Sequence, residues 1–83
     1  MYFVYIIQSK LDGSFYIGFS ENVENRIAEH NSGHTNYTSR KRPWKLVYFE
    51  RFNNKTDALK REVFLKRQRN KKFYQKLIES TDR

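Results

Sequence analysis

The feature that most constrains the fold is the run of residues 2–8, YFVYIIQ, in which nearly every side chain is aromatic or β-branched. Such a run is typical of a β-strand. Because successive side chains of a strand point to opposite faces, this strand is apolar on both sides. A strand of that kind needs cover on both faces, so we expect it at the centre of a sheet with other elements packed on either side.

A hairpin is expected next, because the Asp12-Gly13 pair shortly after this run is a strong turn signal. Residues 14–19, SFYIGF, then predict a second strand. With a two- or four-residue loop, the antiparallel register places Tyr5 and Tyr16 on the same face, whereas a three- or five-residue loop would separate them. Strand tyrosines are more often structural than catalytic, so this pair alone does not indicate a function.

The rest of the chain predicts helices and one more strand. Ser20 is expected to cap the first helix, and Gly33 suits the left-handed position at its end. Residues 33–43 are polar and basic without a hydrophobic period, which indicates a loop. The predicted elements are strands over residues 2–8, 14–19 and 44–52 and helices over residues 22–30, 55–69 and 71–80. The expected fold is α+β, a small three-stranded antiparallel sheet flanked by helices in the order ββαβαα.

The length of 83 residues predicts a single domain over residues 1–83. The chain has no cysteine, which excludes a disulfide or a thiolate metal site. No apolar stretch is long enough for a signal or membrane segment. We therefore expect a soluble, cytoplasmic protein with no membrane partner and no obligate protein partner.

Positive charge is concentrated in one part of the chain. Residues 40–76 hold 14 of the 17 lysines and arginines against three acidic residues, while residues 1–39 hold two against four. This distribution indicates a polyanionic partner. Nucleic acid, and DNA first, is favoured over a membrane surface because no amphipathic segment pairs the charge with an exposed apolar face. The alternative is a solvated basic helix that only aids solubility.

Ten basic side chains of this segment are expected to contact the phosphates of a nucleic acid. Tyr37 and Trp44, beside them, have the chemistry to stack on unpaired bases, although Trp44 equally suits the core. The ten side chains are Arg40, Lys41, Arg42, Lys60, Arg61, Lys66, Arg67, Arg69, Lys71 and Lys72.

Two polar side chains stand out on the first predicted helix. Arg26 and His30 are four residues apart, so both lie on the flank of the apolar stripe and point the same way. A guanidinium fork beside a proton-exchanging imidazole is a good way to present both groups to a phosphate. The alternative is that both are solvated, or that Arg26 pairs with Asn22 or Glu29.

A carboxylate falls inside the apolar face of the second long helix. Ala58, Leu59, Val63 and Leu65 define an apolar arc at the helical period, and Glu62 lies within it. Burying a carboxylate on a docking face costs several kcal/mol unless the group is paired or binds a cation.

Two explanations for Glu62 remain open. One is structural, an internal ion pair with Arg26, Arg69 or His30. The other is functional, a single carboxylate that holds Mg²⁺ (or Mn²⁺) for phosphate chemistry. Magnesium suits so few protein ligands because it keeps most of its waters and takes oxygens from the phosphates of its substrate.

Together these residues resemble the GIY-YIG nuclease superfamily, and most of all its small stand-alone members. The resemblance covers about residues 2–78. It rests on the ordered set Tyr5, Tyr16-Ile17-Gly18, Arg26, His30 and Glu62, and on the segments FYIGFSENVENRIAEHN, YTSRKRPWKLVY and DALKRE. The first tripeptide here is Val4-Tyr5-Ile6 rather than Gly-Ile-Tyr, and Tyr5 is taken as the equivalent tyrosine because it lies eleven residues before Tyr16.

The resemblance implies metal-dependent hydrolysis of phosphodiester bonds in DNA, with RNA as the other possible substrate. It implies that Tyr5 helps to deprotonate the attacking water and that Tyr16 opens the second tripeptide. It also implies that Arg26 braces the phosphate, that His30 assists proton transfer or orients a phenol, and that Glu62 binds the metal. The main alternative is a nucleic-acid-binding module on a nuclease scaffold, with little or no turnover. A structural or protein-interaction domain is disfavoured because it gives Glu62 and the paired phenols no purpose.

Overall fold

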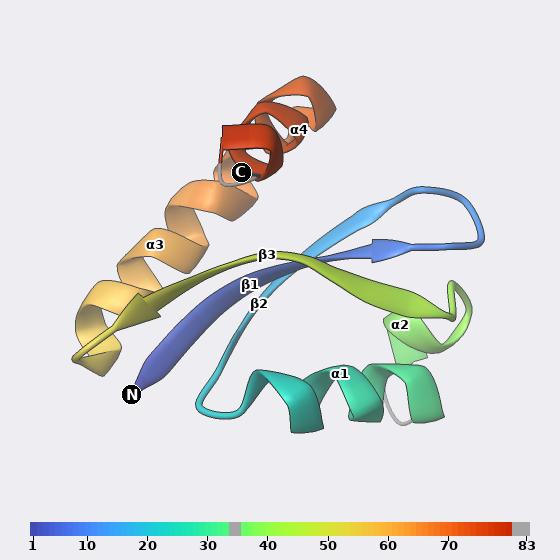
Figure 1. Ribbon diagram of the computed structural model, residues 1–83, viewed down its shortest axis with the longest axis horizontal. Coiled ribbons are helices and arrows are strands. Elements are labelled where there is room, and N and C mark those ends of the chain that lie inside the picture. Colours follow the sequence, from blue (N-terminus) through green and yellow to red (C-terminus); the bar gives the residue numbers. More distant parts are fainter. Residues whose placement is uncertain (34–35, 81–83) are drawn as a thin grey trace.

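Figure 1 shows a three-stranded sheet between helices that cover its two faces. This computed structural model describes residues 1–33 and 36–80. The sheet is antiparallel throughout, with the strand order β2-β1-β3. The elements in chain order are β1 (Tyr2–Ser9), β2 (Phe15–Ser20), α1 (Val23–Ser32), α2 (Asn36–Ser39), β3 (Trp44–Phe52), α3 (Lys55–Gln68) and α4 (Lys71–Ser80). The predicted α+β fold is confirmed.

The apolar run at the start of the chain forms the central strand, as its two apolar faces predict. Val4 and Ile6 are fully buried on the face that α3 and α4 cover. Tyr5 and Ile7 are buried on the opposite face, where they pack with Trp44 and the apolar stripe of α1. Burial of apolar surface on both sides of one strand is the main stabilising contribution in so small a chain.

The hairpin between β1 and β2 brings the two tyrosines to one face. Tyr5 is opposite Gly18, and Ile7 is opposite Tyr16. The last hydrogen bond before the loop runs from Ser9 N to the carbonyl of Ser14 at 2.8 Å, so the loop has four residues. Within it, Gly13 is left-handed at φ +80°. The even-numbered loop gives the register in which the two tyrosines share a face, as predicted.

The N-cap of α1 lies two residues after the predicted one. Asn22, rather than Ser20, is the N-cap, and its side chain accepts a hydrogen bond from Asn25 N at 3.1 Å. Ser20 instead holds the preceding turn, where its hydroxyl accepts from Asn22 N and donates to Asn22 O. The end of α1 is as predicted, because Gly33 is left-handed at φ 89° and donates to Glu29 O.

A short helix, α2, lies within the segment predicted to be a loop. Residues 34 and 35 of that segment are outside the described part of the chain. The indole Nε1 of Trp44 donates to Thr38 O at 2.8 Å, and both residues are buried. A single turn held by such tertiary contacts leaves no hydrophobic period in the sequence. Since Trp44 belongs to the core, the idea that it stacks on bases was wrong.

The buried face of α3 is narrower than its sequence suggests. Ala58 and Leu65 are fully buried, but Leu59 and Val63 are 38% and 47% exposed. The helix therefore docks along a seam two turns long, and the broad apolar arc predicted for it is only half correct. None of the helices in residues 1–33 and 36–80 has the length and apolar character needed to cross a membrane.

Candidate active site

The side chain of Tyr5, on the central strand β1, lies across the edge strand β2. The Tyr5 side chain is buried, and its ring covers Gly18 on β2. A Cβ atom at Gly18 would overlap the Tyr5 hydroxyl and ring. Glycine is therefore required here for close approach rather than for an unusual backbone angle. Because β2 is at the edge of the sheet, the missing side chain lets the hydroxyl reach toward that edge.

The hydroxyl of Tyr5 contacts a fully buried histidine. His30 Nε2 on α1 is 3.0 Å from Tyr5 Oη, and His30 Nδ1 is 2.8 Å from Thr38 Oγ1 on α2. The imidazole also meets the Tyr16 ring edge to face, with the ring centroids 5.0 Å apart. Both ring nitrogens are thus in polar contact, which fixes the orientation of the ring.

Thr38 is the member of this group that the sequence did not reveal. It lies eight residues after His30, in a segment without a period or a motif. Only the packing of α2 against α1 and Trp44 places its hydroxyl beside the imidazole.

Arg26 lies one helical turn before His30 and near the same phenol. Its Nη1 forms an ion pair of 2.7 Å with Glu29 Oε1, so one of the structural alternatives for Arg26 is present. Burial raises the pKa of Tyr5 to about 12, even though a hydrogen bond from Arg26 and its positive charge lower it. The phenol is therefore protonated at neutral pH.

The imidazole of His30 is neutral under the same conditions. Burial lowers the pKa of His30, and the positive charge of Arg26 lowers it further, while the carboxylate of Glu29 acts in the opposite direction. A neutral imidazole has one nitrogen that donates and one that accepts, so it can take a proton from a neighbouring hydroxyl.

Glu62 approaches this group from α3. Its side chain is 16% exposed, and Oε2 pairs with Lys66 Nζ at 3.2 Å. Its negative charge is among the causes that raise the pKa of Tyr5, which places the carboxylate within electrostatic reach of the phenol. The partner of Glu62 is therefore an exposed lysine one turn along the helix. The structural explanation had instead proposed Arg26, Arg69 or His30.

The chemistry of this carboxylate fits a magnesium ion. In the described residues, no group of three or more His, Cys, Asp or Glu side chains could hold a metal by itself. Magnesium does not need such a group, because one or two carboxylates, waters and substrate phosphates complete its six ligands. The ion pair is weak competition for a divalent cation, because its lysine is half exposed to solvent.

The predicted nucleic-acid contacts are not equally open to solvent. Arg61 is half-buried and gives two hydrogen bonds of 2.9 Å to Glu50, which also accepts from the hydroxyl of Tyr48. Lys41 is half-buried and pairs with Asp12 at 2.7 Å. The eight that are exposed are Arg40, Arg42, Lys60, Lys66, Arg67, Arg69, Lys71 and Lys72.

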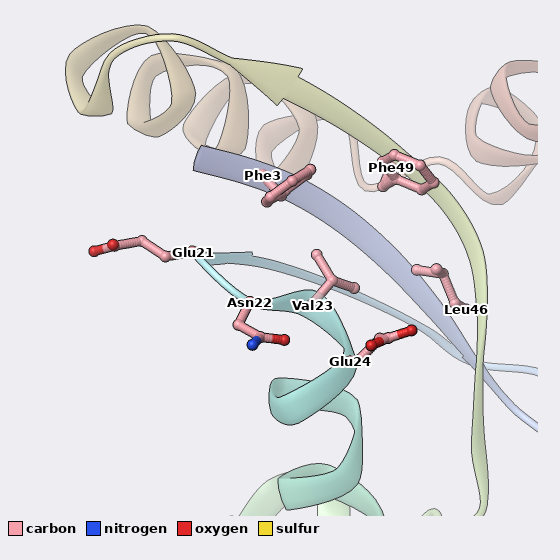
Figure 2. A pocket seen from close by; sticks show the side chains of 7 residues that line it. All are labelled: Phe3, Glu21, Asn22, Val23, Glu24, Leu46 and Phe49. Atoms are coloured by element: carbon pink, nitrogen blue, oxygen red, sulfur yellow. The ribbon is translucent and has the colours of Figure 1, made fainter. Parts of the chain in front are cut away.

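A hollow at the start of α1 lies apart from these residues. Figure 2 shows Phe3, Leu46 and Phe49 from the sheet facing the first turn of the helix. Glu21 and Glu24 line the same hollow, and none of the candidate catalytic residues does. An apolar hollow with two carboxylates does not suit a polyanion.

Comparisons with known proteins identify the family of this chain. A family model, the GIY-YIG catalytic domain, matches residues 1–76. A UPF0213 protein of Staphylococcus saprophyticus is 46% identical over 66 residues, which are 78% of this chain and 79% of that protein. A UPF0213 protein of Clostridium perfringens is 47% identical over 68 residues, which are 81% of this chain and 72% of that protein.

The solution NMR structure of a UPF0213 protein from Bacillus halodurans has a similar fold. It matches with a TM-score of 0.61 and 32% sequence identity, and the match covers 98% of this chain and 86% of the other. The resemblance drawn from the sequence therefore holds at the level of family and fold.

Proposed function

The chain belongs to the GIY-YIG nuclease superfamily, and from this premise we propose that it is a metal-dependent endonuclease that hydrolyses phosphodiester bonds in DNA, with RNA as the other possible substrate. The observation that carries the proposal is the contact of 3.0 Å between Tyr5 Oη and the buried His30 Nε2. Arg26 and Glu62 both act electrostatically on the same phenol. A phenol that contacts an imidazole, with a guanidinium and a carboxylate within electrostatic reach, has the groups that proton transfer at a phosphate needs.

Tyr5 works as a proton relay rather than as a phenolate base, because its pKa of about 12 keeps it protonated. As the oxygen of the attacking water bonds to phosphorus, a water proton passes to Tyr5 Oη, and the phenol proton passes to His30 Nε2. The bond from phosphorus to the leaving oxygen breaks, and that oxygen takes a proton from solvent. The tautomer of His30 that donates from Nδ1 to Thr38 leaves Nε2 free to accept.

The remaining groups bind and orient the phosphate. Arg26 braces its non-bridging oxygens through the guanidinium fork. Tyr16, packed against the His30 ring, holds the imidazole toward the phenol. Glu62 would hold Mg²⁺ or Mn²⁺, which when bound would neutralise charge that develops on the phosphate.

The second candidate function is nucleic-acid binding without turnover. It is favoured by the ion pair between Arg26 and Glu29, which already occupies the guanidinium that the phosphate would need. The exposed cations of α3 and α4 serve this function as well as they serve an endonuclease.

The test is a cleavage assay on plasmid, single-stranded and branched DNA with Mg²⁺, with Mn²⁺ or with chelator. We expect cleavage only with metal, and its loss in Glu62→Gln, which keeps the shape of the side chain. DNA binding should persist in that variant. Glu79→Gln, an exposed substitution on α4, is the matched control and should cleave like the wild type.

Cleavage that survives in Glu62→Gln or in chelator would refute the metal role of Glu62. Tyr5→Phe keeps the ring and removes the relay, so full activity in that variant would refute the proton path. Tight binding without cleavage in either metal would establish the second function instead.

A further inference from the structure

An open hollow adjoins the candidate active site on the side of β2. It is lined by Tyr16, by Tyr37 of α2 and by Lys66 and Arg69 at the end of α3. No carboxylate is among its lining residues. The hollow touches the site at two places, because Tyr16 packs on His30 and Lys66 pairs with the carboxylate of Glu62.

Tyr37 also lines a second hollow. The other residues that line the second hollow are Asn36, Arg40 and Lys41. Lys41 Nζ is 5.9 Å from the centroid of the Tyr37 ring, and the Tyr16 ring centroid is 6.0 Å away at an interplanar angle of 31°. Both hollows that Tyr37 lines therefore contain cationic side chains.

Packing alone does not explain this ring. Tyr37 is 55% exposed and belongs to neither buried core of the sheet. A lone exposed aromatic side chain is ordinary on a protein surface. This one differs because it lines two hollows that also contain cationic side chains, and because it lies beside a tyrosine of the candidate site.

We propose that Tyr37 stacks on an unpaired base of a single-stranded nucleic acid, next to the phosphate at the candidate active site. Lys66 and Arg69 contact the backbone beside that base in one hollow, and Arg40 contacts it in the other. Alternation of a stacking platform with cations is the usual way in which proteins hold single strands. A base inside a duplex is stacked on both of its neighbours, so its face is closed to Tyr37.

The inference names the substrate class of the site under the proposed function, but its test does not require cleavage. Binding is measured by fluorescence anisotropy in chelator, where the proposed metal-dependent cleavage is off. The probes are a labelled 15-nucleotide oligo-dT, an oligo-rU of the same length and a blunt DNA duplex. The wild type should bind the single strands more tightly than the duplex.

The decisive variant is Tyr37→Ala. Stacking on one base contributes about 1–3 kcal/mol, so we expect single-strand affinity to fall by about 5-fold or more, with duplex affinity changed by less than about 2-fold. Tyr37→Phe keeps the ring and should bind like the wild type. Phe49→Ala removes an exposed ring on β3, away from these hollows, and is the matched control.

The proposal is overturned if Tyr37→Ala binds single strands as tightly as the wild type. It is also overturned if the substitution weakens binding to single strands and binding to the duplex equally. Thermal unfolding of each variant identifies any loss of fold. The dT and rU probes separate the two sources of an unpaired base, DNA and RNA. If the binding result holds and no cleavage is found with any metal, the endonuclease proposal fails while the single-strand site stands.

Discussion

At the scale of single residues, the site depends on the absence of a side chain at Gly18 and on the contacts that His30 makes. The glycine leaves the space into which the Tyr5 ring extends over β2. The imidazole lies under α2, with Tyr5 on one nitrogen and Thr38 on the other. Both features are local, and both bear on the same phenol.

Gly18→Ala should lower the free energy of unfolding by about 1–3 kcal/mol, because the new methyl group forces the Tyr5 ring out of its position. Urea unfolding measures the change. The control is the same substitution in a Tyr5→Leu background, where no phenol meets the methyl group and the cost should be much smaller. Equal costs in the two backgrounds would show that the overlap with Tyr5 is not the cause.

The stability of the protein should fall as the pH drops below about 6.5, the usual pKa of histidine in an unfolded chain. Burial and Arg26 lower the pKa of His30, so below that pH the unfolded chain binds more protons than the folded one. The groups that face the imidazole are Tyr5, Tyr16, Arg26 and Glu29.

This pH dependence is checked by urea unfolding at pH 7.5 and pH 5.5, values chosen to bracket about 6.5. His30→Gln cannot take up the proton, so it should lose less stability between the two values than the wild type does. The same loss in both proteins would assign the pH dependence to other groups.

At the scale of elements, one ionic cluster joins α3 to β3. Arg61 gives two hydrogen bonds of 2.9 Å to Glu50, and the hydroxyl of Tyr48 donates to the same carboxylate. Burial raises the pKa of Tyr48 to about 12, and the bond to Glu50 acts in the same direction, so the hydroxyl stays a donor. Because Arg61 directly precedes Glu62, this cluster restrains the rotation of the helix that carries the candidate metal ligand.

Glu50→Gln should destabilise the fold by about 2 kcal/mol, since it removes hydrogen bonds to a charged and partly buried group. The measurement is urea unfolding, with a double-mutant cycle against Arg61→Gln to isolate the pair. Glu29→Gln, which breaks the more exposed pair with Arg26, is the control and should change stability by less than about 0.5 kcal/mol. If Glu50→Gln changed the free energy of unfolding as little as the control does, the ionic cluster would not restrain α3.

At the scale of the whole molecule, the charge is divided between regions. The exposed cations gather on α3, α4 and the segment around α2, whereas the acidic side chains at the start of α1 line the hollow of Figure 2. A polyanion bound near Tyr16 would therefore lie close to these cations and apart from the acidic hollow at the start of α1.

Reversing two charges on α4, with Lys71→Glu and Lys72→Glu together, should weaken DNA binding for every sequence. The slope of log affinity against log salt should flatten by about 0.9 for each phosphate that the protein no longer neutralises. Lys45→Glu with Arg51→Glu, two exposed changes on β3, alters the net charge equally and is the control. A slope that changes only in the control would place the nucleic acid on the other surface.

The sequence by itself determined the features that depend on residues close together in the chain. The apolar run predicted the central strand, the Asp12-Gly13 pair predicted the hairpin that brings Tyr5 and Tyr16 to one face, and Gly33 predicted the end of α1. The family resemblance rested on the same local signals. These features follow from periodicity and turn chemistry, which act between near neighbours in the chain.

Only the tertiary structure decided how distant segments meet. It placed Thr38 against His30, turned Leu59 and Val63 to solvent, and engaged Arg61 with Glu50. It also brought the charge of Glu62 on α3 within reach of the Tyr5 phenol on β1. Such contacts arise because packing selects one arrangement from many that satisfy the same local pattern, so no single stretch of sequence contains them.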